Sequence, residues 1–318
     1  MSLRLVPSAS SIVIPSAAGP SAAGIRCAGY CTPRPAPGLL LGGPMRRGYA
    51  DTAVGQVHYV EAGEGPPLIL LHQTASSSVM WLRAIPYFAE RYHTIAMDTP
   101  GFGMSDHPAE QPTEGIPYYS QAVIGLLDHL GYRQANIVGF HTGASIAVDV
   151  AAHSPERVKS LVIAPILAVD DQAERDDWLS RDDLKSGWVP DGKGEFLAND
   201  ILDYVAHFAT ENDGETYLRE LIAKLQAGPN YWWTYVAVVQ YDHYAAYPKL
   251  QCPVLVLNVT EEVLYSYTTK AHAAIPHSEY VEIPGPEPNI RGWVAVVPEF
   301  PKEFSDAVMS FVDRVEGE

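Results

Sequence analysis

The segment Asn136-Ile137-Val138-Gly139-Phe140-His141-Thr142-Gly143 decides the fold of this chain. Its first residues form the short apolar run of a buried strand, and the small residues from Gly143 to His153 predict a helix. Glycine stands on either side of the turn between them. Because glycine has no side chain to hinder a sharp turn, the segment predicts a tight strand–turn–helix unit around His141.

Strands and helices alternate on both sides of this unit. Apolar residues at helical spacing from Ile116 to Leu130, and again from Phe304 to Val315, predict two amphipathic helices. Short apolar runs predict further strands at 56–60, 67–71, 94–97, 158–163, 254–258 and 280–283. Such alternation is typical of an α/β fold, with a doubly wound, mostly parallel sheet covered on both faces.

The alternation stops between Leu167 and Leu250. This stretch is first acidic and then rich in tyrosine and tryptophan. We expect a helical insertion over the sheet edge rather than a separate partner domain. The sequence therefore predicts a core formed by residues 45–166 and 251–318, with an inserted helical lid at 167–250.

The first 44 residues are built differently from the rest. They are rich in serine, alanine, proline and glycine, and residues 1–50 hold five arginines and no Asp or Glu. A disordered tail, a targeting leader and an over-extended start that makes Met45 the true first residue all remain open. We expect a soluble, cytoplasmic protein, with an organellar or export leader in 1–44 as the alternative.

Composition excludes several other classes of protein. The chain of 318 residues has 38 acidic and 21 basic side chains, which argues against nucleic acid as the main partner. No apolar run is long enough to span a bilayer. Three cysteines do not make a disulfide framework.

Several segments together resemble the α/β-hydrolase superfamily, the lidded proteins related to epoxide hydrolases, dehalogenases and C–C bond hydrolases. Residues 98–106 are similar to its D-x-x-G-x-G-x-S-D turn, and 139–143 stand where the family has its G-x-S-x-G nucleophile elbow. Further matches are Leu70-Leu71-His72 at the oxyanion loop, 252–257 at the strand before the acid, and 299–304 at the last helix. The resemblance runs from about residue 50 to the C-terminus. It implies that the site lies at the carboxyl ends of the strands, beneath the lid.

The sequence departs from this family at the reacting groups. His141 stands where the family has its nucleophile, and the family's terminal histidine aligns with Pro288 or Val294, neither of which transfers a proton. The acid is Glu262 or Glu261. Because a serine mechanism needs the nucleophile and its histidine together, a standard Ser-His-Asp esterase is excluded.

The oxyanion loop departs as well, since Gln73 stands where the family has glycine. Its side-chain amide is a candidate donor to an oxyanion, and the alternative is that it only packs while the backbone forms the hole. Thr142, directly after the apex, is expected to supply its backbone N–H. Pocket-lining roles are predicted for His72, Trp233, Tyr235 and His243, each with simple packing as the alternative.

Two functions follow from different classes. In the first, His141 is a general base or nucleophile oriented by Glu262, and the protein performs hydrolysis or proton transfer on a small hydrophobic ester, lactone or ketone. In the second, it is a catalytically inactive pseudo-hydrolase that binds such a carbonyl compound. A metal held by His72, His141 and Glu262 is disfavoured because no metal-ligand spacing supports it. No cofactor is implied.

Overall fold

The computed structural model describes residues 44–181, 192–196, 214–260, 262–285, 297 and 300–317. The expectations for residues 1–43, for Glu261 as the alternative acid, and for Pro288 and Val294 lie outside these residues. No helix in the described ranges is long and apolar enough to cross a membrane.

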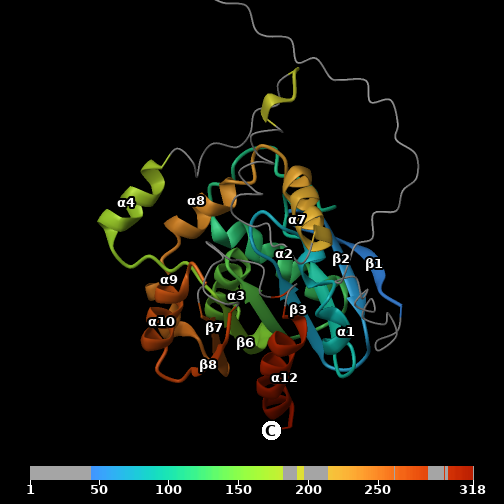
Figure 1. Cartoon of the computed structure of the whole chain (residues 1–318). Helices are drawn as coiled ribbons and strands as arrows, with labels where there is room; N and C mark the ends of the chain where they lie inside the picture. The colour runs from blue at the N-terminus through green and yellow to red at the C-terminus, as the bar shows by residue number, and fades with distance from the viewer. Residues whose placement is uncertain are drawn as a thin grey trace, which may run out of the picture. The chain divides into compact units, whose positions relative to one another are not determined.

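The described chain forms one sheet of eight strands in the order β1-β2-β4-β3-β5-β6-β7-β8 (Figure 1). The first two strands and β4 pair antiparallel, and all other pairs are parallel. This confirms the predicted mostly parallel sheet. The strands are β1 Arg46–Thr52, β2 Gly55–Ala62, β3 Pro67–Leu71, β4 His93–Met97, β5 Ala135–Phe140, β6 Val158–Ala164, β7 Val254–Val259 and β8 Glu279–Ile283.

Helices cover both faces of the sheet, so alternate residues of a strand enter different cores. In β3, Ile69 and Leu71 belong to one core, whereas Leu68 and Leu70 belong to the other. The first core is covered by α2 (Ile116–His129), α3 (Thr142–His153) and α10 (Tyr265–Ala274). The second is covered by α1 (Ile85–Phe88) and α12 (Pro301–Gly317). The fold is therefore doubly wound, as predicted.

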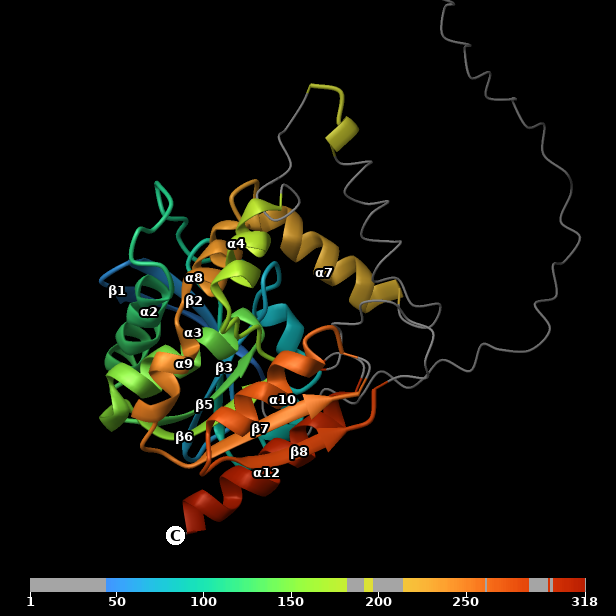
Figure 2. The same cartoon turned by 90° about the vertical axis from the view of Figure 1, so that its left-hand side faces the viewer.

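The described residues between β6 and β7 are helical where they are regular. The main elements there are α4 (Gln172–Ser180), α7 (Gly214–Ala227), α8 (Trp233–Gln240), α9 (His243–Ala246) and the 3-10 turn η3 (Tyr247–Lys249). Figure 2 shows α4, α7 and α8 outside the sheet, with α7 on the side toward which the arrowheads of β7 and β8 point. These helices thus lie where the strand–helix alternation stops.

Candidate active site

The turn between β5 and α3 is a strained elbow with His141 at its apex. His141 is the one described non-glycine residue with positive φ, at φ 50° and ψ −111°, a conformation that costs about 1–3 kcal/mol. A Cβ added to Gly139 would lie 2.3 Å from the Gly143 carbonyl oxygen, and one added to Gly143 would lie 2.3 Å from that of Leu71. Glycine is therefore required on both sides of the apex.

His141 and Glu262, predicted as catalytic partners, are in direct contact. The ring nitrogen Nε2 of His141 lies 2.7 Å from Oε1 of Glu262, which follows the carboxyl end of β7. The Glu262 side chain is fully buried, and its other oxygen accepts the backbone N–H of Leu264. The Phe140 ring stacks on the His141 ring, with centroids 4.7 Å apart and an interplanar angle of 6°. The stacking on one face of the ring and the contact at Nε2 thus fix the orientation of the imidazole.

This contact determines which nitrogen of His141 is left for chemistry. A carboxylate only accepts hydrogen bonds, so Nε2 carries the hydrogen and Nδ1 carries the lone pair of the neutral ring. No described residue hydrogen-bonds to Nδ1, and the His141 side chain keeps 14% of its surface exposed. The arrangement leaves one basic nitrogen without a protein partner beside a buried carboxylate.

The loop from His72 to Ser78, at the end of β3, is held by its own histidine. Nε2 of His72 accepts the backbone N–H of Thr99 at 2.9 Å, and Nδ1 donates to the carbonyl of Gln73 at 2.7 Å. Burial lowers the pKa of His72, which keeps the ring neutral as these bonds require. Because both nitrogens bond backbone atoms, His72 shapes the loop and offers no polar atom to a ligand. Its predicted role in lining a pocket finds no support in these contacts.

Asp98 ties this loop to the turn that follows β4. Its carboxylate contacts Nδ1 of His58 at 2.8 Å and accepts the N–H groups of Ser78 at 2.6 Å and Met104 at 2.9 Å. Burial raises the pKa of Asp98, but these hydrogen bonds outweigh it and lower the pKa overall. A Cβ on Gly103 would lie 2.1 Å from the carboxylate, so the turn needs glycine there.

Three threonines connect the loop to the elbow and to α8. Oγ1 of Thr74 lies 2.8 Å from that of Thr142 and 2.6 Å from that of Thr234, which in turn donates to the carbonyl of Tyr231. The Tyr235 hydroxyl donates to the Thr74 carbonyl at 3.1 Å. The Thr142 hydroxyl therefore points to the loop. Its backbone N–H, at the first residue of α3, has no acceptor within the helix and is the group left for an oxyanion.

Gln73 is buried in the same loop. Its backbone carbonyl accepts the Ser76 N–H at 2.9 Å, while its side-chain Oε1 is buried with no hydrogen-bond partner among the described residues. A buried amide oxygen without a partner is costly and marks a place where a ligand or water group would be favoured. The amide as an oxyanion donor stays a prediction.

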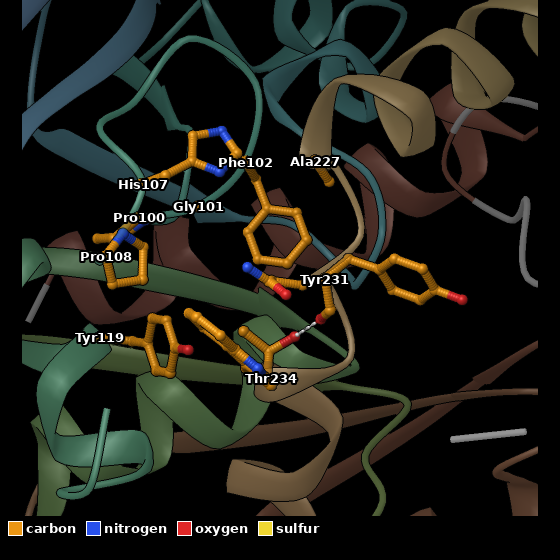
Figure 3. A pocket seen from close by; sticks show the side chains of 11 residues that line it. Pro100, Gly101, Phe102, His107, Pro108, Tyr119, Ala227, Tyr231 and Thr234 are labelled. Carbon is orange, nitrogen blue, oxygen red and sulfur yellow. Dashed lines mark hydrogen bonds between the residues drawn. The ribbon is translucent and has the colours of Figure 1, made fainter. Parts of the chain in front are cut away.

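A small cavity lies beside α8 (Figure 3), and Trp233, predicted to line the substrate pocket, is among the residues that line it. The cavity holds about 20 Å³, room for about one water molecule. Neither His141 nor Glu262 lines it. Its walls are Pro100, Gly101, Phe102, His107, Pro108, Tyr119, Ala227, Asn230, Tyr231, Trp233 and Thr234.

His243, the other predicted pocket residue, is completely buried against α3. Its Nε2 lies 2.9 Å from Oγ of Ser145, and its ring packs on Tyr241 and Tyr247. Burial lowers the pKa of His243 to about 3, so it is neutral throughout the physiological range. These contacts are those of a packed interior residue, the alternative that the sequence left open.

Comparison with known proteins agrees with this architecture. The model of the α/β-hydrolase fold family matches residues 66–290, and the chain belongs to this family. Among solved structures, the enol-lactonase from Burkholderia xenovorans has a TM-score of 0.69 at 19% identity, covering 84% of this chain and 100% of its own. At that identity the likeness shows the fold alone.

Similarity to individual curated proteins is partial. A haloalkane dehalogenase of Mycobacterium bovis is 29% identical over 38% of this chain and 42% of its own length. A soluble epoxide hydrolase of Corynebacterium is 36% identical over 35% of this chain and 38% of its own. The (E)-2-((N-methylformamido)methylene)succinate hydrolase of Acinetobacter baylyi is 26% identical over 64% of this chain and 76% of its own. The chain thus matches less than half the length of the first two relatives.

Proposed function

We propose that this protein is a hydrolase with a non-standard site, in which His141 acts as general base on a small hydrophobic ester, lactone or ketone. The observation that carries the proposal is the 2.7 Å contact between His141 Nε2 and Glu262 Oε1 at the apex of a strained elbow. A residue that served packing alone would not require a positive φ and a buried carboxylate partner together. The hydrolase and dehalogenase names of the similar proteins support the same class of reaction.

In the proposed reaction, Nδ1 of His141 takes a proton from a water molecule whose oxygen attacks the carbonyl carbon. Glu262 stabilises the imidazolium that forms, because its buried carboxylate accepts the Nε2 hydrogen. The carbonyl π electrons move to the oxygen, which the Thr142 N–H and the Gln73 amide would stabilise. For an ester or lactone, collapse of the oxyanion breaks the bond to the leaving oxygen, which takes up a proton, and the imidazolium gives up the proton that it took, so that His141 is restored.

We further propose that the described helices α4, α7, α8 and α9 belong to a lid spanning 167–250 over a core of 45–166 and 251–318. The contacts of Thr234 and Tyr235 with Thr74 support this, because they attach α8 to the loop beside the elbow. A lid in this place would exclude water other than the attacking molecule and would favour an apolar substrate.

The test is turnover of small aromatic esters, lactones and diketones by wild type and by His141→Ala. Loss of the general base is expected to lower kcat by about 10²–10⁴-fold. His153→Ala is the matched control, since His153 lies on the same helix, is half exposed and pairs with Asp149. Equal turnover by wild type and His141→Ala would exclude the proposal.

The second candidate, an inactive binding protein, has a distinct signature in the same experiment. It predicts no turnover of any panel member, together with saturable binding measured by calorimetry. Binding that weakens in His141→Ala would then assign the histidine a purely polar contact with the ligand.

A further inference from the structure

A buried carboxylate on α7 has no role in the fold described above. Glu220 is 7% exposed and shares its side of the helix with the buried apolar residues Leu221, Ala223 and Ala227. Ionisable side chains are almost never buried in such surroundings unless they are paired. Glu220 therefore stands out among the carboxylates of the described chain.

The partner of Glu220 is in the loop beside the elbow. The Ser76 hydroxyl is the polar group that acts most strongly on its carboxylate, and Ser76 is itself 1% exposed. Helix α7 packs on η1 (Ser78–Trp81), the turn that continues this loop and that has no charged residue. The one charged group that acts on Glu220 from its own helix is Arg219, which is engaged in an ion pair with Glu215 at 2.6 Å.

This environment keeps a proton on Glu220 near neutrality. Burial raises the pKa of Glu220 to about 7, and the Ser76 hydroxyl and Arg219 only partly oppose it. A carboxylic acid with a pKa near the working pH can both give up and regain a proton, as general acids must.

The sequence lacks the family's terminal histidine, so the role of general acid is open to another group. After residue 243 the chain has only His272 and His277, and His272 lies on α10, where its Nδ1 bonds Ser278. His141 can take a proton from water, but no described residue near it has been assigned to protonate the leaving group. We propose that Glu220 is this general acid, an inference that rests on the proposed function of the His141–Glu262 pair.

The contacts bring Glu220 to the same end of the sheet as the elbow. Ser76, its partner, donates its backbone N–H to Gln73, and Thr74 in the same loop bonds Thr142 beside the apex. The loop and the elbow leave neighbouring strands, because Leu71 of β3 is in register with Gly139 of β5. The acid on α7 and the base on the elbow are thus both linked to the same loop.

The proton balance closes over one turnover. Water loses a proton to Nδ1 of His141 as its oxygen bonds to the carbonyl carbon. Collapse of the oxyanion breaks the bond to the leaving oxygen, whose electron pair takes the proton of Glu220. The imidazolium then returns its proton to the Glu220 carboxylate through water. The net change is ester plus water to carboxylic acid plus alcohol, with both side chains restored.

The test uses the leaving group, because only a poor one needs an acid. We expect Glu220→Gln to lower kcat about 100-fold on alkyl esters, and less than about threefold on the matching 4-nitrophenyl ester, whose phenolate departs unprotonated. Activity on the 4-nitrophenyl ester also shows that the variant is folded. Glu215→Gln, an exposed carboxylate on the same helix, should match wild type on both substrates.

A second readout follows the proton itself. The alkyl-ester rate of wild type should fall as the pH rises through about 7, where Glu220 loses its proton, and Glu220→Gln should lack this limb. Equal losses on both esters, or an unchanged alkyl-ester rate, would overturn the assignment to Glu220.

The experiments distinguish a failure of the Glu220 assignment from a failure of the function proposed for the His141–Glu262 pair. If His141→Ala retains full turnover, the proposed function fails. If His141→Ala loses turnover while Glu220→Gln retains it on alkyl esters, the base stands and the acid alone is wrong.

Discussion

His72 and His141 occupy equivalent places on neighbouring strands but are used in opposite ways. Each is the first residue after a parallel strand, His72 after β3 and His141 after β5. The nitrogens of His72 both bond backbone groups, and the residue is 1% exposed. His141 has one nitrogen on a carboxylate and one without a described partner, on a side chain that is 14% exposed. The difference separates a histidine that shapes a loop from one that can accept a proton.

The same contrast extends to the carboxylate that serves each region. Asp98 supports the loop, because its carboxylate oxygens bond His58 and two backbone N–H groups. All of these contacts hold chain segments together. In Glu262, one carboxylate oxygen accepts a backbone N–H and the other accepts the hydrogen bond from His141. We therefore expect changes at Asp98 and His72 to affect stability, and changes at Glu262 and His141 to affect turnover.

The largest expected effect is on turnover, in Glu262→Gln. An amide in this place cannot offset the charge of the imidazolium, so kcat should fall about 10³-fold, which corresponds to about 4 kcal/mol. The free energy of unfolding should change by less than about 1 kcal/mol. Glu282→Gln serves as control, because Glu282 is an exposed carboxylate that accepts a hydrogen bond from Tyr265. Turnover within threefold of wild type would show that Glu262 does not assist His141.

The next effect is on stability, in Asp98→Ala. Removing this carboxylate leaves His58, the buried Ser78 N–H and the half-buried Met104 N–H without their acceptor, which should lower the free energy of unfolding by about 3 kcal/mol in urea denaturation. Asp106→Ala is the control. Its carboxylate accepts the Gln56 N–H at an exposed site, where about 1 kcal/mol or less is expected. A loss at Asp98 no larger than at Asp106 would contradict the supporting role.

Most of the sheet was predictable because its strands are short apolar runs buried on both faces. Each predicted strand, from 56–60 to 280–283, is present within about two residues of its predicted ends. β1 was missed because it is an edge strand with only Ala50 buried. α10 was missed because its buried residues are only Thr268 and Ala271, so it has no apolar stripe for periodicity to detect.

The site was predictable only where backbone geometry leaves a mark in the sequence. Gly139 and Gly143 marked the elbow, and the end of β7 marked Glu262, because each position follows from strand order. Thr74, His58 and Glu220 carry no such mark, since their roles depend on partners 40 to 160 residues away. The predictions that Trp233 and His243 line a pocket rested on residue type and on their place in the insertion, which do not distinguish a lining residue from a packed one.

A direct comparison of the two histidines predicts a larger loss of stability at His72 than at His141. His72→Phe leaves the buried Thr99 N–H without a partner and removes one of the two hydrogen bonds to the Gln73 carbonyl, so the free energy of unfolding should fall by about 2 kcal/mol. His141→Gly releases a positive φ but leaves the buried Glu262 carboxylate without this partner, so the two effects offset in part and the free energy of unfolding should fall by less than in His72→Phe. Chemical denaturation of both variants measures the difference. A larger loss at His141 than at His72 would mean that the elbow histidine is also structural.

The smallest effect concerns His243, a third histidine that its contacts place with His72 rather than with His141. Its pKa in the folded chain is about 3, below the ordinary value near 6.5. At pH values between about 3 and 6.5 the unfolded chain binds a proton at His243 and the folded chain does not. The free energy of unfolding therefore falls as the pH is lowered through this range. From pH 6.5 to 5.5 this one site should contribute about 1 kcal/mol of loss. His243→Gln lacks the titration, and its denaturation midpoint should depend less steeply on pH than that of wild type. Equal slopes would show that His243 titrates normally and is reached by solvent, which would return it to the candidates for a role beside His141.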